Sequence, residues 1–313
     1  FAQPYPDELQ YMRSGEVVRQ DAPEEVAGSP PLALVTGANG YVGDLLIPRL
    51  LEAGWRVRAL VRDPRLGASP LNERIQVQFA DMNDPVGVRK ALADVDVAFY
   101  LVHDLKGGKG LRRREQSMAR IFVRAAAAAS VGRIVYLGGL RPTGRASTHL
   151  RSRMAVGDTF LDSNVPAVVL QSAIIIGANS IPLQLLRCAA ETLPILPERG
   201  WFSTRCQPIA ESDVLHYLMA AASAPLDVNQ EIDIGGPDVL TYGEMIRQCA
   251  VIVGRRSHGP HVSALLRLAR APGAIHAQVL RRLLAGLGSE VIVRDARAAM
   301  WLGEPANGLT GFG

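Results

Sequence analysis

Short apolar runs alternate with longer segments of helical spacing between residues 32 and 171. The runs contain few polar positions, which is typical of strands that are buried on both faces of a sheet. They lie at residues 32–36, 56–61, 75–80, 95–102, 133–139 and 166–171. The segments between them predict helices at residues 41–53, 85–92, 112–130 and 149–163. This alternation predicts an α/β fold with a doubly wound parallel sheet and right-handed crossovers.

The alternation loosens after Ile174. We predict a helix over 181–193, then a short strand and a helix that is capped near Ser212 or Asp213. A further strand is expected at 230–236. It is followed by a helix over 241–254, which begins with a threonine cap and ends at a glycine.

Three parts of the chain are expected to behave differently. Residues 1–30 are polar and lack the apolar stretch of a signal peptide, so we expect a polar arm or leader outside the fold. Alternatively, this segment packs on the body or on a partner protein. Residues 31–173 hold most of the sheet, and residues 174–313 form a lobe that is interleaved with it. Within that lobe, residues 261–286 predict a helix that packs on the body or, alternatively, lies on a membrane surface.

Composition and charge exclude several kinds of partner. Of the 313 residues 48% are hydrophobic, which is enough for a large core. The net charge of +4 is too small and scattered to indicate nucleic-acid binding. No apolar run reaches the roughly 18 residues of a membrane-spanning helix. The three cysteines are far apart, which indicates a reducing compartment, and we expect a cytoplasmic protein with no bound metal.

A glycine-rich stretch joins the first strand to the first helix. Gly37, Gly40 and Gly43 stand at three-residue steps in LVTGANGYVG. Such glycines allow a sharp turn, a close approach of the backbone to a diphosphate, and tight packing of the helix on the strand. The start of the helix then offers free N–H groups to the phosphates. The position of this stretch in a strand–helix–strand unit favours a Rossmann-type dinucleotide site over a ligand-free turn.

The motifs around this loop resemble those of atypical and extended short-chain dehydrogenase/reductases, and of their NmrA-like NAD(P)H-binding branch in particular. The resemblance spans roughly residues 32–255. It is carried by TGANGYVG (36–43), ALVRDP (59–64), FADMNDP (79–85), FYLVHDL (99–105), RIVYLGGL (133–140), HLRSRMAVG (149–157), PIAESDVLHYL (208–218) and DIGGPDVLTYGEM (233–245). It implies an NAD(P)-binding Rossmann domain at residues 31–173 and a substrate or lid lobe at residues 174–313.

The resemblance also implies a set of cofactor-binding residues. They are Thr36, Gly37, Asn39, Gly40, Tyr41, Val42, Gly43, Arg62, Asp81, Met82, Leu101, Val102, His103 and Arg153. Arg62 follows the second strand, where a guanidinium suits the 2′-phosphate of NADP(H), so we favour NADP(H) over NAD(H). Alternatively, Arg62 pairs with Asp63 at the surface. Asp81 would accept from the adenine amino group or cap the following turn.

The usual Ser-Tyr-Lys catalytic residues of these enzymes are missing. No tyrosine lies between Tyr136 and Tyr217, and no lysine follows Lys109. His149 and Arg153 occupy the YxxxK spacing. Either His149 is a substitute proton donor and Arg153 holds cofactor, or His149 caps its helix and Arg153 makes an ordinary polar contact.

Other groups that could transfer a proton are His103, Asp104 and His216, although His216 lies in a helical pattern that favours a structural role. A quinone or flavin acceptor would need little acid catalysis.

Residues 172–202 are rich in Ile and Leu and include Trp201 and Phe202. They form either the wall of a pocket for an apolar ligand or plain core. The sequence therefore predicts an NADP(H)-dependent oxidoreductase that acts on a small apolar acceptor. The alternative is a non-catalytic NADP(H) sensor or scaffold subunit of a larger assembly. A sugar-nucleotide epimerase is disfavoured because it needs the missing tyrosine.

Overall fold

The structure, a computed structural model, describes residues 29–62, 74–103, 110–192, 200–225, 229–252 and 287–312. The predicted arm at residues 1–30 lies outside the described residues except for its last two positions. The helix predicted at residues 261–286 and the glycine stop of the helix before it also lie outside them.

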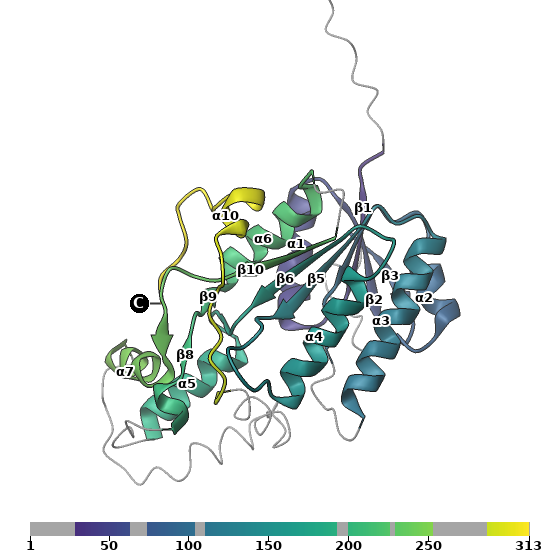
Figure 1. The fold of residues 1–313 in the computed structure, drawn as a ribbon. Coiled ribbons are helices and arrows are strands. Elements are labelled where there is room, and N and C mark those ends of the chain that lie inside the picture. Colours follow the sequence, from purple (N-terminus) through teal and green to yellow (C-terminus); the bar gives the residue numbers. More distant parts are fainter. Residues whose placement is uncertain are drawn as a thin grey trace, which may run out of the picture. The chain divides into compact units, whose positions relative to one another are not determined.

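A seven-stranded parallel sheet forms the centre of the described part of the chain (Figure 1). The strand order is β10-β6-β5-β4-β1-β2-β3. From β1 the chain adds β2 and β3 on one side of the sheet, and it then returns to add β4 and the later strands on the other side of β1. Every pairing within it is parallel, which confirms the predicted doubly wound α/β fold. The strands are β1 (Leu32–Thr36), β2 (Arg56–Val61), β3 (Gln76–Phe79), β4 (Val97–Tyr100), β5 (Arg133–Gly139), β6 (Ala167–Ser172) and β10 (Gln230–Ile234).

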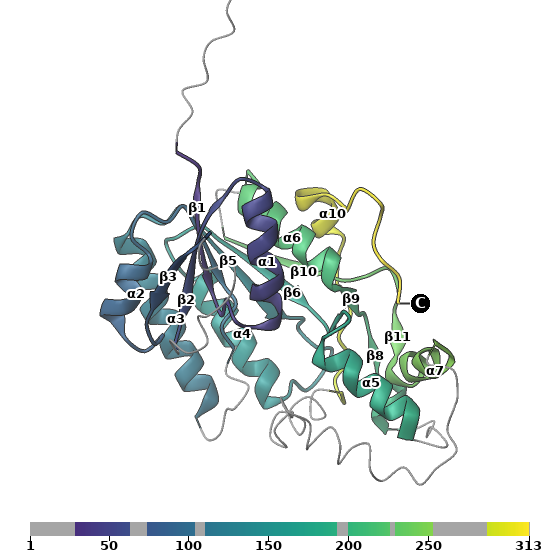
Figure 2. The same ribbon diagram turned by 180° about the vertical axis from the view of Figure 1, so that it is seen from behind.

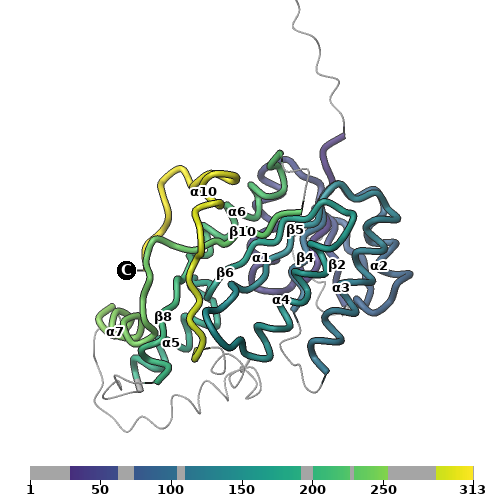
Figure 3. The backbone as a smooth tube through the Cα atoms, viewed as in Figure 1, coloured from purple at the N-terminus to yellow at the C-terminus, as the bar shows by residue number. Residues whose placement is uncertain are grey.

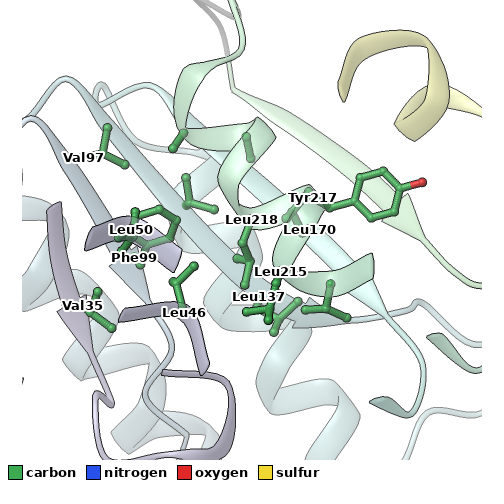
Figure 4. Close-up of a cluster of buried hydrophobic side chains, with 14 of the residues drawn as sticks. Val35, Leu46, Leu50, Val97, Phe99, Leu137, Leu170, Leu215, Tyr217 and Leu218 are labelled. Carbon is green, nitrogen blue, oxygen red and sulfur yellow. The ribbon is translucent and has the colours of Figure 1, made fainter. Parts of the chain in front are cut away.

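Helices cover both faces of this sheet. One face is covered by α1 (Tyr41–Glu52) and α6 (Glu211–Ser223), whose apolar side chains pack on Val35, Phe99 and other strand residues (Figures 2 and 4). The other face is covered by α2 (Pro85–Ala91), α3 (Leu111–Ala128) and α4 (Thr148–Leu161). Because both faces are covered, the strands are almost continuously apolar.

A smaller apolar cluster holds the C-terminal lobe together. It includes Leu186 from α5 (Ile181–Thr192), and Tyr242 and Met245 from α7 (Tyr242–Ile252). The lobe also contains two short strand pairs that are separate from the central sheet: β7 (Ile175–Ile176) with β9 (Ile209–Ala210), and β8 (Arg205–Cys206) with β11 (Leu240–Thr241).

The segment 287–312, drawn in yellow in Figure 3, includes α10 (Arg297–Leu302) and lies along the edge strand β10. Arg294 Nε donates to Asp233 at 2.6 Å, and its Nη2 donates to Glu231 at 2.6 Å. Arg141, which follows β5, donates to Glu231 from its Nη2 at 2.7 Å. Although burial opposes it, these guanidinium hydrogen bonds lower the pKa of Glu231. The carboxylates of Asp233 and Glu231, paired with Arg294, therefore fasten the C-terminal segment to the sheet edge.

The elements predicted in the described residues form with boundaries that differ by a few residues at most, with two corrections. The stretch 205–210 holds two short strands instead of one. The cap predicted near Ser212 or Asp213 is wrong, because α6 begins at Glu211 with Ala210 at its N-cap. Asp213 instead accepts hydrogen bonds from the N–H and hydroxyl of Thr310. The threonine cap before α7 is confirmed, since Thr241 Oγ1 accepts from Glu244 N at 3.1 Å.

Candidate cofactor and active site

The glycine-rich loop between β1 and α1 has glycines at the positions where an added Cβ would meet the backbone of the protein. Gly37 has a φ of +67°, and a Cβ there would lie 3.0 Å from the carbonyl oxygen of Leu101. The N–H of Gly40 donates to the carbonyl of Gly37 at 2.8 Å, which closes the turn. A Cβ on Gly43 would lie 2.9 Å from Ala38 Cα. Gly40 is the N-cap of α1 and supplies no side-chain cap, so N–H groups of the first turn point toward any ligand in the loop.

A cavity of about 680 Å³ opens above this loop, at the carboxyl ends of β1, β2 and β4. It lies beside the point between β1 and β4 where the strand order reverses, which is the usual ligand position in open α/β sheets. Every predicted cofactor residue except Thr36 lines it: Gly37, Asn39, Gly40, Tyr41, Val42, Gly43, Arg62, Asp81, Met82, Leu101, Val102, His103 and Arg153. Sequence reasoning missed Arg114 and Met118, which line it from α3.

Thr36 ends β1 and connects the start of the glycine loop to the segment that follows β4. Its side chain is fully buried, and its hydroxyl donates to the carbonyl of Phe99 at 3.1 Å. The same oxygen accepts from the N–H of Leu101 at 3.0 Å. Thr36 therefore fixes the start of the glycine loop against the segment 101–103 that follows β4.

The cavity wall includes the guanidinium groups of Arg62 and Arg114 and the carboxylate of Asp81. Arg62 directly follows β2, and Arg114 projects from the first turn of α3. Asp81 Oδ1 accepts from the backbone N–H of Asn83 at 2.8 Å and from its side-chain amide at 2.7 Å. Asp81 thus caps its own turn while it also lines the cavity, so the two alternatives for this residue do not exclude each other.

Arg153 lines the cavity from α4. Its Nη2 donates to the carbonyl of Leu137, and its guanidinium carbon lies 6.0 Å from the centre of the Tyr136 ring. The Tyr136 hydroxyl donates back to the carbonyl of Arg153 at 3.1 Å. Burial raises the pKa of Tyr136 to about 12, which keeps this hydroxyl protonated. A Cβ on Gly139 would meet Leu150 Cδ1 at 2.8 Å, so the missing serine would not fit without a shift.

His149 is neither a helix cap nor a residue of the cavity wall. The helix α4 begins at Thr148, and Ser147 caps it by accepting from Leu150 N at 3.2 Å. The alternative in which His149 caps the helix is therefore wrong. The His149 ring instead packs edge-on against the ring of His103, with centroids 4.5 Å apart.

A buried carboxylate lies behind His103. Glu115 on α3 is 4% exposed, and its Oε1 lies 3.1 Å from His103 Nδ1. Sequence reasoning missed Glu115, although a signal was available. It falls on the apolar stripe of α3, four residues after Leu111 and three before Met118. An acidic residue in such a stripe must find a buried partner.

The remaining candidates do not join this cluster. Asp104 lies outside the described residues, and His216 on α6 contacts the carbonyl of Gly303 at 3.2 Å. Trp201 and Phe202 stack on each other at 3.8 Å and pack against the C-terminal cluster. From the described part of residues 172–202, Ile175 lines the cavity. For Trp201 and Phe202 the structure therefore supports the core alternative.

Residues 37–162, which contain the glycine-rich loop and most of the cavity wall, match the family of NAD(P)H-binding domains. The chain contains an NAD(P)H-binding domain. The chain is also similar to a ceramide reductase of Caulobacter vibrioides, with 25% identity over 71% of this chain and 70% of that protein. A dihydroflavonol 4-reductase of Hordeum vulgare is 34% identical over a shorter stretch, 24% of this chain and 23% of the relative.

The fold of the domain is shared with solved structures. The UDP-glucose 4-epimerase of Thermotoga maritima superposes with a TM-score of 0.64 over 87% of this chain and 92% of that chain, at 14% identity. This likeness shows a common architecture and not a common reaction.

One observation that is independent of these comparisons supports the fit between this domain and an NAD(P)H cofactor. The loop is a concave backbone surface in which added Cβ atoms would collide with the protein, and its N–H groups begin a helix. Within the described residues no helix is long and apolar enough to cross a membrane, and no cluster of side chains is suited to holding a metal ion.

Proposed function

We propose that the chain is an NADP(H)-dependent oxidoreductase of the atypical short-chain type, in its NmrA-like branch, acting on a small apolar acceptor. The observation that carries this proposal is one cavity that is lined by the glycine loop, three arginines and His103, with Glu115 in contact with His103 from behind. The ceramide reductase similarity supports a reductive reaction on an apolar molecule.

The choice of NADP(H) rests on Arg62 and Arg114. Both guanidinium groups line the cavity, and Arg62 directly follows β2, where the adenosine ribose would bind, while Asp81 belongs to its own turn. A 2′-phosphate adds two negative charges that guanidinium groups bind strongly. An NAD(H)-specific site would instead offer a carboxylate to the ribose hydroxyls directly after β2.

The residues that line the cavity would have two roles: some would bind the cofactor and others would orient it. The N–H groups of the loop 37–43 bind the diphosphate, and Arg153 orients the nicotinamide ribose. Leu101, Leu137 and Ile175 supply apolar walls that exclude water. A bound reduced nicotinamide would supply a hydride to the acceptor.

A second function, a non-catalytic NADP(H) sensor or scaffold, is favoured by one observation. Gly139 and Arg153 stand where a serine and a lysine would act, and Arg153 is engaged with Leu137. Residues 1–30 would then serve as the contact to a partner protein. For both functions we propose the cytoplasm, since the three cysteines are free thiols.

Binding and turnover of the purified chain separate these functions. NADPH and NADH are titrated by fluorescence, and oxidation is then followed by the loss of nicotinamide absorbance with quinones and carbonyl compounds. We expect NADPH to bind more tightly and to be oxidised. Tight binding without oxidation of NADPH by any acceptor would favour the sensor.

The substitution Arg62→Glu tests the cofactor choice. It should weaken NADPH binding roughly 100-fold and change NADH binding less than about threefold, because a charge reversal acts on the 2′-phosphate alone. Arg124→Glu on the exposed surface of α3 makes the same change of charge away from the cavity and is the control. An unchanged preference in Arg62→Glu would contradict the assignment of NADP(H).

A further inference from the structure

Three elements bring polar side chains together behind the cavity wall. His103 follows β4 and lines the cavity, Glu115 projects from α3, and α4 supplies Ser152 and His149. His103 Nδ1 lies 3.1 Å from Glu115 Oε1, and the Ser152 hydroxyl donates to Glu115 Oε2. Glu115 thus has both oxygens engaged while it is almost completely buried.

An ionised carboxylate in this buried position lowers the stability of the fold unless its partners compensate for the lost hydration. Burial of an ionised carboxylate removes it from water, and only hydrogen bonds and a nearby positive charge repay that cost. Ser152, which is fully buried, supplies one hydrogen bond and His103 supplies the other. A carboxylate that accepts from Nδ1–H leaves Nε2 of the neutral ring able to accept a proton. It also stabilises the imidazolium, which can donate that proton from Nε2.

We propose that His103 is the proton donor to the acceptor's oxygen, and that Glu115 is its positioning residue, in place of the missing tyrosine and lysine. This inference rests on the oxidoreductase function proposed above. During reduction of a carbonyl compound, the bond from Nε2 to its proton breaks and an O–H bond forms on the product alcohol. The reduced nicotinamide supplies the electron pair and the carbon-bound hydrogen. The neutral His103 regains its proton from water.

The charged and titratable groups around His103 fit this assignment. Glu115 on α3 and His149 on α4 contact it, while Arg114 and Arg153 line the same cavity. Two guanidinium groups disfavour an imidazolium, so Glu115 is needed to offset them.

The tyrosines near this cluster are poor donors by comparison. Burial, assisted by the charge of Glu115, raises the pKa values of Tyr100 and Tyr136. The Tyr136 hydroxyl is also committed to the carbonyl of Arg153. Neither tyrosine lines the cavity, whereas His103 does.

The first measurement is independent of turnover. Histidine is labelled isotopically in the free protein, and the imidazole resonances are followed by NMR during a pH titration. Glu115→Gln should move the titration of His103 to lower pH, because the neutral amide no longer stabilises the imidazolium. Glu52→Gln, an exposed change on α1, should leave it where it is. If Glu115→Gln does not fold, Ser152→Ala retains the carboxylate and should move the same resonance less far.

The second measurement is the pH dependence of NADPH oxidation. His103→Gln should lower kcat about 100-fold and change NADPH affinity less than about threefold, since a general acid contributes at least that factor. Glu115→Gln should lower kcat about tenfold and move its pH profile to lower pH. Glu52→Gln, the exposed change on α1, should leave kcat within about threefold of the wild type.

The outcomes separate this inference from the function on which it rests. Failure of the wild type to oxidise NADPH with any acceptor overturns the oxidoreductase and the donor role together. Turnover in the wild type with an unchanged pH profile in Glu115→Gln overturns the His103–Glu115 assignment alone. A larger loss of kcat in His149→Phe than in His103→Gln would transfer the donor role to His149.

Discussion

The two ends of the cavity are built in different ways. One part of the wall, the backbone end, is a continuous stretch from Gly37 to Gly43, whose shape depends on three glycines that lack a Cβ. The other part, the side-chain end, is made by His103 after β4 and Arg153 on α4, with Glu115 on α3 in contact with His103. The first end therefore follows from a local motif, and the second depends on tertiary packing.

The two ends are expected to tolerate substitutions differently. A backbone cradle tolerates few changes, because every added atom meets the main chain. A side-chain cluster can exchange its members as long as a proton donor, a partner charge and a shape remain. Catalytic groups can thus be replaced on a conserved binding scaffold.

The largest expected effect comes from a single methyl group at the backbone end. Gly43→Ala places a Cβ against the carbonyl of Gly37 and 2.9 Å from Ala38 Cα, so the cradle must open. We expect the affinity for NADPH to fall at least about 100-fold, which is about 2.7 kcal/mol. Fluorescence titration measures it.

Gly288→Ala is the control for this substitution. A Cβ at Gly288 meets no atom within 4 Å, so NADPH binding should be unchanged. Binding within threefold of the wild type in Gly43→Ala would mean that the loop adapts, and the contrast between the two ends would be lost.

A moderate effect is expected where the two ends meet. Thr36→Val removes the hydroxyl that donates to Phe99 O and accepts from Leu101 N. It leaves two buried backbone groups unsatisfied, so the free energy of unfolding should fall by about 1–3 kcal/mol. NADPH affinity should fall about threefold to tenfold, because the segment 101–103 loses its anchor.

Chemical denaturation and the same titration measure the two effects of Thr36→Val. Thr159→Val removes a comparable hydroxyl on α4, which donates to the carbonyl of Ala155, and should lower stability without changing NADPH affinity. A Thr36→Val variant that loses stability yet binds NADPH as the wild type does would show that the two ends are independent.

The sheet could be predicted from the sequence because its signal is local. Strands such as 133–139, buried on both faces, are apolar throughout, and the turn at Gly37 requires a positive φ. The start of α6 was misplaced because Ser212 and Asp213 are good cap residues in any context. Asp213 is instead held by Thr310, nearly a hundred residues away in sequence, and no local pattern reports such a contact.

The candidate site divides in the same way. The wall residues near the glycine loop could be placed from motifs, whereas the roles of Trp201 and Phe202 could not, because a pocket wall and a core have the same composition. The charged neighbours of Glu115 obscure its place on the apolar stripe of α3. That stripe indicates burial, but only the tertiary structure shows that its partners are Ser152 and His103.

The smallest expected effect comes from changing a side chain at the backbone end. Tyr41 lines the cavity in the first turn of α1, and its hydroxyl donates to Glu211 on α6. Burial and Glu211 raise the pKa of Tyr41, so the hydroxyl stays protonated at neutral pH. Tyr41→Phe removes one hydrogen bond and should lower the free energy of unfolding by about 1 kcal/mol.

NADPH affinity in Tyr41→Phe should stay within about twofold of the wild type, because the peptide N–H groups and not the phenol would hold the diphosphate. Fluorescence titration beside Gly43→Ala makes the comparison direct: one substitution adds a methyl group to the main chain, and the other removes a polar atom from a side chain. A tenfold loss in Tyr41→Phe would show that side chains also shape this end. The division between a backbone end and a side-chain end would then hold for the geometry of the cavity but not for its binding energy.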